Sequence, residues 1–376
     1  MKLKNEFVLA ALAPDANVAE LCREAGISRK TGYKWIARFR DGGLPALEDA
    51  SRRPHTSPLR ASGSAVLEVV ALRAERPRWG PKKLRAVLLR RLPAAEVPSV
   101  RTVARIIERA GLVERRRRPP PGIDARPEGA PDVTVTAAND LWTVDFKGWW
   151  LAGDGSRCEP LTARDAHSRY VLCASLLAAA NGAAVRGEFE RLFDKHGLPL
   201  AIQVDNGSPF ACTRARGGLT TLSAWWVSLG IRLVRGRPAH PQDNGGHERM
   251  HFDMRFDVED HAGSDLAAQQ RLLDIWREEF NHVRPHEALG QRVPSEVYKR
   301  SPRRMRGPRP AMYPADFEVR RVNAKGSIKY AGRLLRVGDG LRRQLVGVRR
   351  LDDSTLQLRY YDVDLGLIEL PAARVA

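Results

Sequence analysis

Cysteine is scarce in this chain, and the cysteines form no pattern. They stand at Cys22, Cys158, Cys173 and Cys212, with no Cys-x-x-Cys pair among them. Such spacing argues against a disulfide framework and against a structural zinc ribbon, and it suits a reducing compartment.

Long apolar runs are missing too. A membrane span needs about 18 consecutive apolar residues, which no window of the sequence approaches. The apolar run at residues 7–13 is also too short for a signal peptide. We therefore expect a protein of the cytoplasm that has no membrane partner.

Acidic residues are too few to balance the basic ones. The 376 residues include 63 Lys and Arg against 44 Asp and Glu, which gives a formal net charge of +19. Such a surplus is self-repulsive unless a polyanion neutralises it, and nucleic acid is the leading candidate. A membrane surface is the second candidate, but no strongly amphipathic basic helix supports it. The length predicts about two to four domains.

Residues 18–40 predict two short helices that are joined at Gly26. Ser28 is a good N-cap for the second helix. A pair of this kind, with basic residues opening the second helix, is typical of a helix-turn-helix; the alternative is a plain helical hairpin with a solvated basic face. The pattern resembles the helix-turn-helix of bacterial transposases and repressors. By that resemblance, the residues that would approach DNA are Ser28, Arg29, Lys30, Tyr33 and Lys34.

A second helical unit follows in three segments, at residues 63–76, 81–91 and 99–110. Ser99 is placed to cap the last segment, and Gly111 to end it. The segments again look like a helix-turn-helix, and two such units in tandem would read a longer DNA site than one. The candidate DNA contacts in this unit are Lys82, Lys83, Arg101, Thr102 and Arg105.

Four adjacent arginines and three prolines come next. Like charges in a row repel one another unless anions neutralise them, and consecutive prolines forbid a helix. The stretch is therefore a linker, which either lies along a phosphate backbone or is solvated. The arginines, also candidate DNA contacts, are Arg115, Arg116, Arg117 and Arg118.

From residue 139 short apolar runs alternate with amphipathic segments. The pattern predicts strands at 141–146, 158–164, 170–177, 200–204 and 231–234, and helices at 183–196, 219–229, 245–260 and 264–283. This order predicts an α/β core with a mixed five-stranded sheet and helices on its faces. Beyond residue 317, short β-branched segments between turns predict a small β-barrel, whose many arginines suggest a sequence-independent contact with DNA.

The whole chain is thus predicted to be multidomain. The segments are two N-terminal all-α helix-turn-helix domains at 1–50 and 51–113, a basic Pro-rich linker at 114–138, the α/β core at 139–300, a basic linker at 301–316 and the small β-barrel at 317–376.

Three acidic residues stand where a sheet edge would expose them. Asp145 ends the first predicted core strand, and Asp205 ends the fourth, just before a forced turn. In the ribonuclease H arrangement strands one and four are neighbours, so both carboxylates would emerge side by side. Glu248 lies near the start of the helix at 245–260, on the side that carries Phe252 and Phe256, which we expect to pack on the sheet.

Three converging carboxylates repel one another strongly when ionised, so such a cluster implies a divalent cation. Oxygen ligands favour Mg²⁺ or Mn²⁺, and two such ions per site would activate a water or a 3′-hydroxyl for in-line attack on phosphorus. The alternative metal is zinc, because His247 and His251 stand four residues apart, as do His282 and His286. Neither pair has a cysteine or carboxylate at the partner spacing that zinc needs.

Four longer motifs occur in order along the core: WTVDFKG, VDNGSPF, HPQDNGGHERMH and FNHVRPHEALGQRVPSEVY. Together they resemble the bacterial insertion-sequence transposases that have a retroviral-integrase-type DDE catalytic core, which is ribonuclease H-like. The resemblance covers about residues 139–300. The stretch between Asp205 and Glu248 is a little longer than is usual in this family, and we assign the excess to residues 212–218.

The resemblance implies roles for individual residues. Asp145, Asp205 and Glu248 would be the catalytic residues and would bind the metal. A second set would support the core: Asn206, Asn244, Asn281, Arg284 and His286.

The function that the resemblance implies is that of a DNA transposase, which binds the inverted repeats at its element's ends, cleaves the 3′ ends and joins them to target DNA. Its partners would be double-stranded DNA and further copies of itself, since joining two ends demands at least two active sites. It would lie in the bacterial cytoplasm, on the nucleoid when bound to DNA. One alternative is a transposase-derived regulator, against which the complete acidic triad speaks. The other is a nuclease for RNA–DNA hybrids, which would not need paired helix-turn-helix units.

Overall fold

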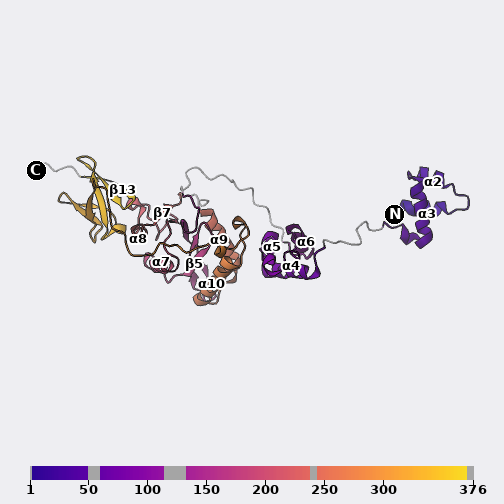
Figure 1. Cartoon of the computed structure of the whole chain (residues 1–376), viewed down its shortest axis with the longest axis horizontal. Coiled ribbons are helices and arrows are strands. Elements are labelled where there is room, and N and C mark those ends of the chain that lie inside the picture. The colour runs from indigo at the N-terminus through magenta and orange to yellow at the C-terminus, as the bar shows by residue number, and fades with distance from the viewer. Residues whose placement is uncertain (1, 50–59, 114–132, 238–243, 371–376) are drawn as a thin grey trace. The chain divides into compact units, whose positions relative to one another are not determined.

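The computed structural model describes residues 2–49, 60–113, 133–237 and 244–370. The arginine run at residues 115–118 lies outside the described residues. The chain divides into two compact units, residues 1–60 and residues 61–376 (Figure 1).

The first unit is a small helical group. It consists of α1 (Lys2–Ala11), α2 (Val18–Glu24), α3 (Arg29–Gly42) and the short helix η1 (Leu44–Leu47). Ser28 caps α3 as predicted, because its Oγ accepts a hydrogen bond of 3.2 Å from the backbone N–H of Thr31. The sequence pattern does not foresee α1. This helix packs on α3 through Phe7, whose ring meets that of Trp35 edge-on with centroids 5.6 Å apart.

Three further helices open the second unit, close to the predicted segments. They are α4 (Gly63–Glu75), α5 (Pro81–Arg91) and α6 (Val100–Arg109). Ser99 caps α6 by accepting a hydrogen bond of 3.3 Å from the N–H of Thr102. The three helices surround an apolar core of their own, which includes Val69, Leu72, Trp79, Leu84, Leu88 and Val103.

The centre of the second unit is a mixed five-stranded sheet, as predicted. Its strands are β1 (Leu141–Phe146), β4 (Pro160–Asp165), β5 (Val171–Leu176), β6 (Ala201–Val204) and β7 (Arg232–Arg235). Their order is β5-β4-β1-β6-β7. Strand β1 is antiparallel to β4 and parallel to β6, and β6 is parallel to β7. The expected strand at 158–164 is divided: residues 157 and 158 form β3 (Arg157–Cys158), which pairs with β2 (Trp150–Leu151) outside the main sheet.

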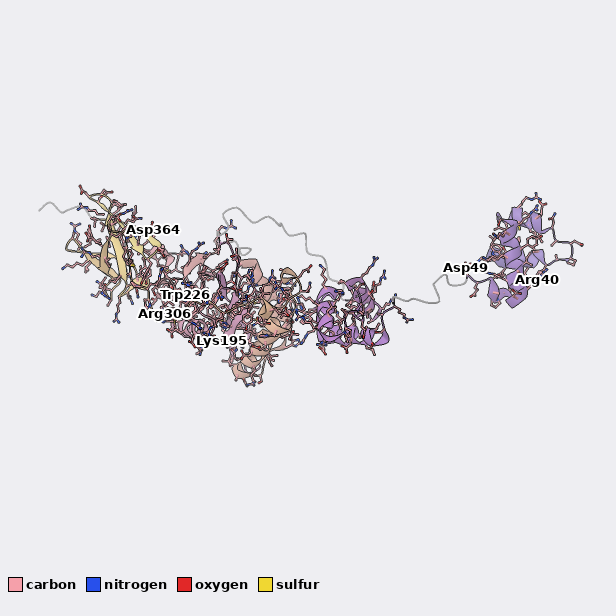
Figure 2. All side chains as sticks on the ribbon, viewed as in Figure 1. Arg40, Asp49, Lys195, Trp226, Arg306 and Asp364 are labelled. Carbon is pink, nitrogen blue, oxygen red and sulfur yellow. The ribbon has the colours of Figure 1, made fainter. Side chains whose placement is uncertain are left out.

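Helices cover both faces of this sheet. On one face, α7 (Gly182–His196) and α8 (Thr221–Ser228) bury large aromatic side chains of the core, among them Phe189, Phe193 and Trp226. Figure 2 labels Trp226 within the core domain. On the other face lie α9 (Gly245–Asp257) and α10 (Leu266–His282), which pack Met250, Met254 and Trp276 with residues of β5.

Side-chain amides of α10 hydrogen-bond the edge strand β5. Asn281 accepts a hydrogen bond from the N–H of Val171 at 2.8 Å and donates one to its carbonyl at 2.9 Å. Gln270 does the same with the N–H of Leu176 and the carbonyl of Ala174, at 2.8 and 3.1 Å. Helix α10 thus gives the edge strand the partners that another strand would otherwise supply.

The last part of the second unit is antiparallel. A four-stranded sheet has the order β13-β12-β11-β8, and β9 pairs with β10 in a separate hairpin. Among the residues that the structure describes, these pairings do not close a barrel, so the prediction holds only as far as an antiparallel sheet. The strands are β8 (Glu318–Arg321), β9 (Ser327–Tyr330), β10 (Arg333–Arg336), β11 (Leu345–Arg350), β12 (Thr355–Tyr360) and β13 (Val363–Glu369).

This antiparallel sheet packs on α8 of the core, beside which it lies in Figure 1. The hydroxyl of Tyr360 donates a hydrogen bond to the carbonyl of Ala224 at 3.2 Å. The loop at residues 212–218, interpreted above as an insertion, extends the contact, because Arg216 Nη1 donates to the carbonyl of Leu367 at 2.7 Å. The insertion therefore forms part of the support for β13.

Across the described ranges, no helix combines the length and the apolar character that crossing a membrane would require.

Replacing Asn281 with Leu should lower the free energy of unfolding by about 2–4 kcal/mol, because each buried polar group left without a partner costs roughly 1–3 kcal/mol. Both backbone groups of Val171 would be orphaned by this change. Urea denaturation of the purified chain measures the effect. Arg271→Leu, at an exposed position of the same helix, is the control and should change stability by less than about 0.5 kcal/mol. Equal stabilities of the two variants would contradict the prediction.

Candidate active site

Asp145 and Asp205 emerge at the same edge of the sheet. The parallel register pairs Thr143 of β1 with Gln203 of β6, and each aspartate lies two residues further along its strand direction. The Asp145 side chain is 32% exposed, and Asp205 is exposed. The prediction that strands one and four of the core are neighbours is therefore confirmed, and both carboxylates reach solvent where these strands end.

The turn after β6 folds back onto Asp205. A Cβ atom at Gly207 would lie 2.8 Å from Asp205 Oδ2, so a larger residue at this position would displace the carboxylate. Asn206 Nδ2 donates a hydrogen bond of 2.7 Å to the carbonyl of Gly236, just beyond β7. The predicted supporting residue Asn206 thus joins this turn to the neighbouring strand.

Glu248 lies in the first turn of α9 and is exposed. The expectation that Phe252 and Phe256 pack on the sheet is wrong. Phe252 is 45% exposed, and the side chains that α9 buries against the sheet include His247, Met250 and Met254. These positions are three and four residues apart, so they form one helix face of their own. The sequence periodicity is compatible with burial of either helix face, and the structure buries the face that carries Met250 and Met254.

The three carboxylates influence one another electrostatically. The pKa of Asp145 is raised from 3.8 to about 7, first by burial, then by the charge of Asp205, and less by that of Glu248. Yet among the described residues no three His, Cys, Asp or Glu side chains stand close enough to hold a metal ion. The sheet places two of the acids, and Glu248 is exposed in the first turn of α9.

Buried polar groups beneath Asp145 are what the sequence reasoning missed. Thr162 of β4 contacts both His247 and His251, at 2.7 and 2.8 Å from their Nε2 atoms. Burial lowers the pKa of His247 well below its ordinary value, and the pKa of His251 falls to about 3 through burial and the charges of Lys147 and Arg164. The available signal was a threonine inside each of two largely buried strands, Thr143 in β1 and Thr162 in β4.

Two of the remaining predicted supporting residues lie beside α9 and α10. Arg284 is 3% exposed, and its Nη1 lies 3.2 Å from Asp257 and 3.6 Å from Asp253, both on α9. His286 is buried against the ring of Phe280, with centroids 4.7 Å apart, and burial lowers its pKa to about 3. Asn244 precedes α9 but makes no side-chain cap. Asn281 serves the edge of β5, as described above.

The predicted DNA contacts of the first unit are mostly exposed. Ser28 uses its Oγ as the cap of α3, which leaves the following side chains to face a ligand. The exposed ones at the start of α3 are Arg29, Lys30, Tyr33 and Lys34.

In the second helical group, some of the predicted DNA contacts are exposed and others lie against the core. Arg101 and Arg105 are exposed on α6, and Thr102 beside them is half-buried. Lys82 instead pairs with Glu287 of the core. The pKa of Lys83 is lowered to about 8 by burial and then by the charge of Arg284. The lysines at the start of α5 therefore face the core's own charges in this structure.

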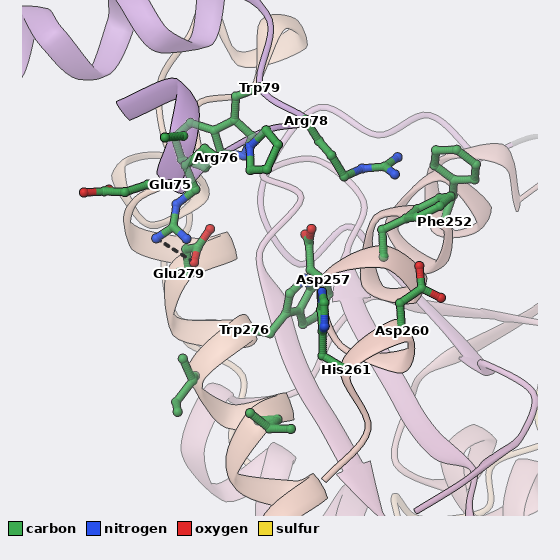
Figure 3. A pocket seen from close by; sticks show the side chains of 15 residues that line it. Glu75, Arg76, Arg78, Trp79, Phe252, Asp257, Asp260, His261, Trp276 and Glu279 are labelled. Carbon is green, nitrogen blue, oxygen red and sulfur yellow. Dashed lines mark ion pairs between the residues drawn. The ribbon is translucent and has the colours of Figure 1, made fainter. Parts of the chain in front are cut away.

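A cavity of about 870 Å³ lies where this helical group meets α9 and α10 (Figure 3). The guanidinium of Arg78 lies 3.5 Å from the ring centroid of Phe256, and Arg76 pairs with Glu279 at 2.9 Å. Arg90 pairs with Glu296 at 3.0 Å. The cavity is lined by residues 74–79 and by the C-terminal part of α9, so it is separate from the carboxylate edge, where Glu248 opens the same helix.

Parts of this chain match known protein families. A helix-turn-helix domain matches residues 4–55, and a homeodomain-like domain matches residues 31–107. Two models, both described as an integrase core domain, match residues 135–241 and residues 229–294. The chain contains an integrase core. The two matches together include Asp145, Asp205 and Glu248.

Two relatives of this chain are proteins of insertion elements. The chain is 26% identical over 291 residues to the insertion element IS407 uncharacterized 31.7 kDa protein of Burkholderia multivorans, a match that covers 77% of this chain and 93% of the relative. It is 28% identical over 280 residues to the insertion element IS476 uncharacterized 39.2 kDa protein of Xanthomonas euvesicatoria, covering 73% and 70%.

Among solved structures, the catalytic core domain of HTLV-2 integrase in complex with magnesium is similar at 14% identity and a TM-score of 0.34, covering 43% of this chain and 98% of that one. A likeness this distant adds nothing to what the domain matches show.

Replacing Asp145 with Asn should stabilise the metal-free integrase core at high pH. Folding raises the pKa of Asp145, so the folded protein loses stability when this acid ionises. The loss in free energy of unfolding is absent below about pH 4, grows as the pH approaches 7 and is complete above it. We expect the variant to gain about 1–2 kcal/mol at about pH 8, a value reduced for partial exposure, and nothing at about pH 4. Unfolding in EDTA measures both. Asp194→Asn, an exposed acid on α7, is the control, and a variant no more stable than wild type at pH 8 would refute the expectation.

Proposed function

We propose that this protein is a DNA transposase, which binds the ends of its own element, cleaves the DNA at the 3′ ends and joins those ends to target DNA. The observation that carries the proposal is the emergence of Asp145 and Asp205 at one sheet edge of an integrase core, with Glu248 close enough to act on the charge of Asp145. A carboxylate cluster of this kind is costly to the fold, which favours a chemical role over a structural one. That the relatives belong to insertion elements supports the same function.

The donor set fits a hard divalent cation. All three side chains offer carboxylate oxygens, which Mg²⁺ and Mn²⁺ prefer, and a bound cation would offset the burial and the neighbouring negative charges that raise the pKa of Asp145. We propose two such ions per active site, held by Asp145, Asp205 and Glu248. Bound there, they would activate a water or a 3′-hydroxyl and stabilise the leaving oxygen in an in-line displacement at phosphorus.

The chain's own part in this chemistry is positioning. Strands β1 and β6 hold Asp145 and Asp205, and the Gly207 turn keeps the Asp205 carboxylate close to its own backbone. We propose that Glu248, in the first turn of α9, completes the site. No side chain of the protein needs to become a nucleophile, because water attacks first and the freed 3′-hydroxyl attacks second.

Recognition of the element ends is assigned to the helix-turn-helix domains. Phosphate contacts supply affinity, whereas base edges in the major groove supply sequence information. Exposed Arg29 and Lys30 open α3, and exposed Arg101 opens α6, which suits insertion of either helix into that groove. Joining two ends needs at least two active sites, so the active species would be a dimer or a larger homo-oligomer on DNA.

The C-terminal antiparallel sheet is proposed to add a contact with DNA that does not depend on sequence. Several of its arginines form local ion pairs in this structure: Arg336 and Arg342 with Asp339, Arg349 with Asp316, and Arg350 with Asp353. All these pairs are largely exposed, and exposed pairs are weak. Phosphates would therefore compete with the carboxylates at low cost.

The second candidate function is a DNA-binding regulator that keeps the fold without the chemistry. The observation that favours it is that no three His, Cys, Asp or Glu side chains among the described residues stand close enough to hold a metal ion. Both functions predict DNA binding, and only the transposase predicts metal-dependent cleavage.

Asp205→Asn should abolish cleavage and strand transfer, while DNA binding stays equal or becomes slightly tighter because a negative charge near phosphate is lost. The assay is a gel with labelled duplex that carries the DNA at the end of the element, run with Mg²⁺ and, separately, with Ca²⁺, which should support binding without chemistry. Asp194→Asn is the matched control and should cleave normally. An Asp205→Asn chain that joins DNA at the wild-type rate would remove this residue from the site, and a wild type that binds without cleaving would favour the regulator.

Arg29→Ala or Arg101→Ala should reduce discrimination between the element end and scrambled DNA by about 1–3 kcal/mol, if the arginine pairs with a guanine. Replacing Arg115 to Arg118 with Ala should instead weaken binding to any sequence and flatten its salt dependence by about one unit of slope per lost phosphate contact. Titrations of both duplexes at several salt concentrations separate the two effects. An isolated 1–112 fragment that binds scrambled DNA as tightly as the element end would move recognition elsewhere in the chain.

A further inference from the structure

One hydroxyl group contacts the elements that carry two of the three acids. Thr162 is fully buried on β4, directly opposite Asp145 in the antiparallel register with β1. Its Oγ1 donates a hydrogen bond of 2.9 Å to the backbone carbonyl of Asp145. The same atom lies 2.7 Å from Nε2 of His247 and 2.8 Å from Nε2 of His251, both on α9.

The direction of each hydrogen bond follows from the supply of protons. A hydroxyl has one proton and two lone pairs, and a carbonyl can only accept, so the Thr162 proton goes to Asp145. Both imidazoles must then donate from Nε2. This leaves Nδ1 of His247 as an acceptor, and the hydroxyl of Thr143 lies 2.8 Å from it. Every polar side-chain atom of Thr162 and His247 therefore has a partner.

These bonds attach α9 to the sheet on both sides of Glu248. His247 precedes Glu248, His251 follows it by three residues, and the two imidazole rings lie 4.6 Å apart on one helix face. Arg164 of β4 also donates to the carbonyl of Gly246, in the first turn of the helix. Anchors one turn apart fix both the rotation of the helix about its axis and its height above the sheet, and these two quantities decide where Glu248 points.

We propose that Thr162 is a positioning residue for the active site, whose hydroxyl sets the place of Glu248 relative to Asp145. The inference rests on the proposed function. Thr162 has no exposed surface, so it touches neither DNA nor metal and acts only through the strand and the helix that it joins. It differs in this respect from the three acids, which reach solvent.

The test compares Thr162→Val, which keeps the branched shape and removes the hydroxyl, with Thr162→Ser, which restores the hydroxyl. Mn²⁺ binding to the full chain without DNA is measured by electron paramagnetic resonance, and hydrogen exchange follows the backbone amides of α9. Thr162→Val should weaken Mn²⁺ binding and slow cleavage of the element-end duplex by about 10- to 100-fold each, as loss of a residue that orients metal ligands does. Exchange in α9 should become faster, DNA affinity should stay the same, and Thr162→Ser should recover most of each loss.

Ser228→Ala is the control for losing a buried hydroxyl as such, because Ser228 is 2% exposed and donates to Trp225 of α8 instead. If Thr162→Val does not fold, the same comparison is made with His251→Phe, which removes the N–H donor, and His251→Gln, which keeps one. Only His251→Gln should then retain Mn²⁺ binding. The proposal fails if Thr162→Val binds Mn²⁺ and cleaves like wild type, or if Ser228→Ala loses as much. A wild-type chain that neither binds Mn²⁺ nor cleaves would overturn the proposed function itself.

Discussion

The cost of ionised carboxylates at one sheet edge is the constraint that the rest of the integrase core must offset. The parallel pairing of β1 with β6 brings Asp145 and Asp205 out at the same edge, and burial makes the ionised form of Asp145 more costly. A fold that holds such an arrangement without a cation must be stabilised elsewhere. The apolar layer under α7 and α8, with Trp142, Phe189 and Trp226 fully buried, is the largest source of that stability.

The opposite face of the sheet is more polar, and hydrogen bonds there join the helices to the strands. Thr143, Thr162 and His247 form a connected set beneath Asp145, and Asn281 and Gln270 bind the backbone of the edge strand β5. Buried polar groups are costly when unpaired and specific in geometry when paired. This face therefore determines where α9 and α10 lie, whereas the apolar face determines that the sheet is stable.

Charge also governs how the second helical group meets the core. Lys82, Arg76 and Arg90 pair with Glu287, Glu279 and Glu296, so cations that would suit phosphate contact carboxylates of the same chain. Such partly exposed pairs exchange readily for other anions. The basic surplus of the sequence is thus only partly available to a ligand in this arrangement, while the exposed cations of α3 and α6 stay accessible.

The amino-acid sequence by itself determined the local features. Serines at 28 and 99 start helices because a hydroxyl before a helical run satisfies a first-turn N–H. The acids lie at strand ends, Asp145 as the last residue but one of β1 and Asp205 directly after β6. Only the tertiary structure decided which face of α9 is buried: Met250 and Met254 pack on the sheet, where Phe252 and Phe256 were expected. It also decided the partners of Lys82, the open pairing of the C-terminal strands and the three bonds of Thr162. The reason is physical: local patterns record what a residue requires of its near neighbours in the chain, whereas a buried hydroxyl and its imidazoles, 85 and 89 residues away, meet only when strands and helices pack.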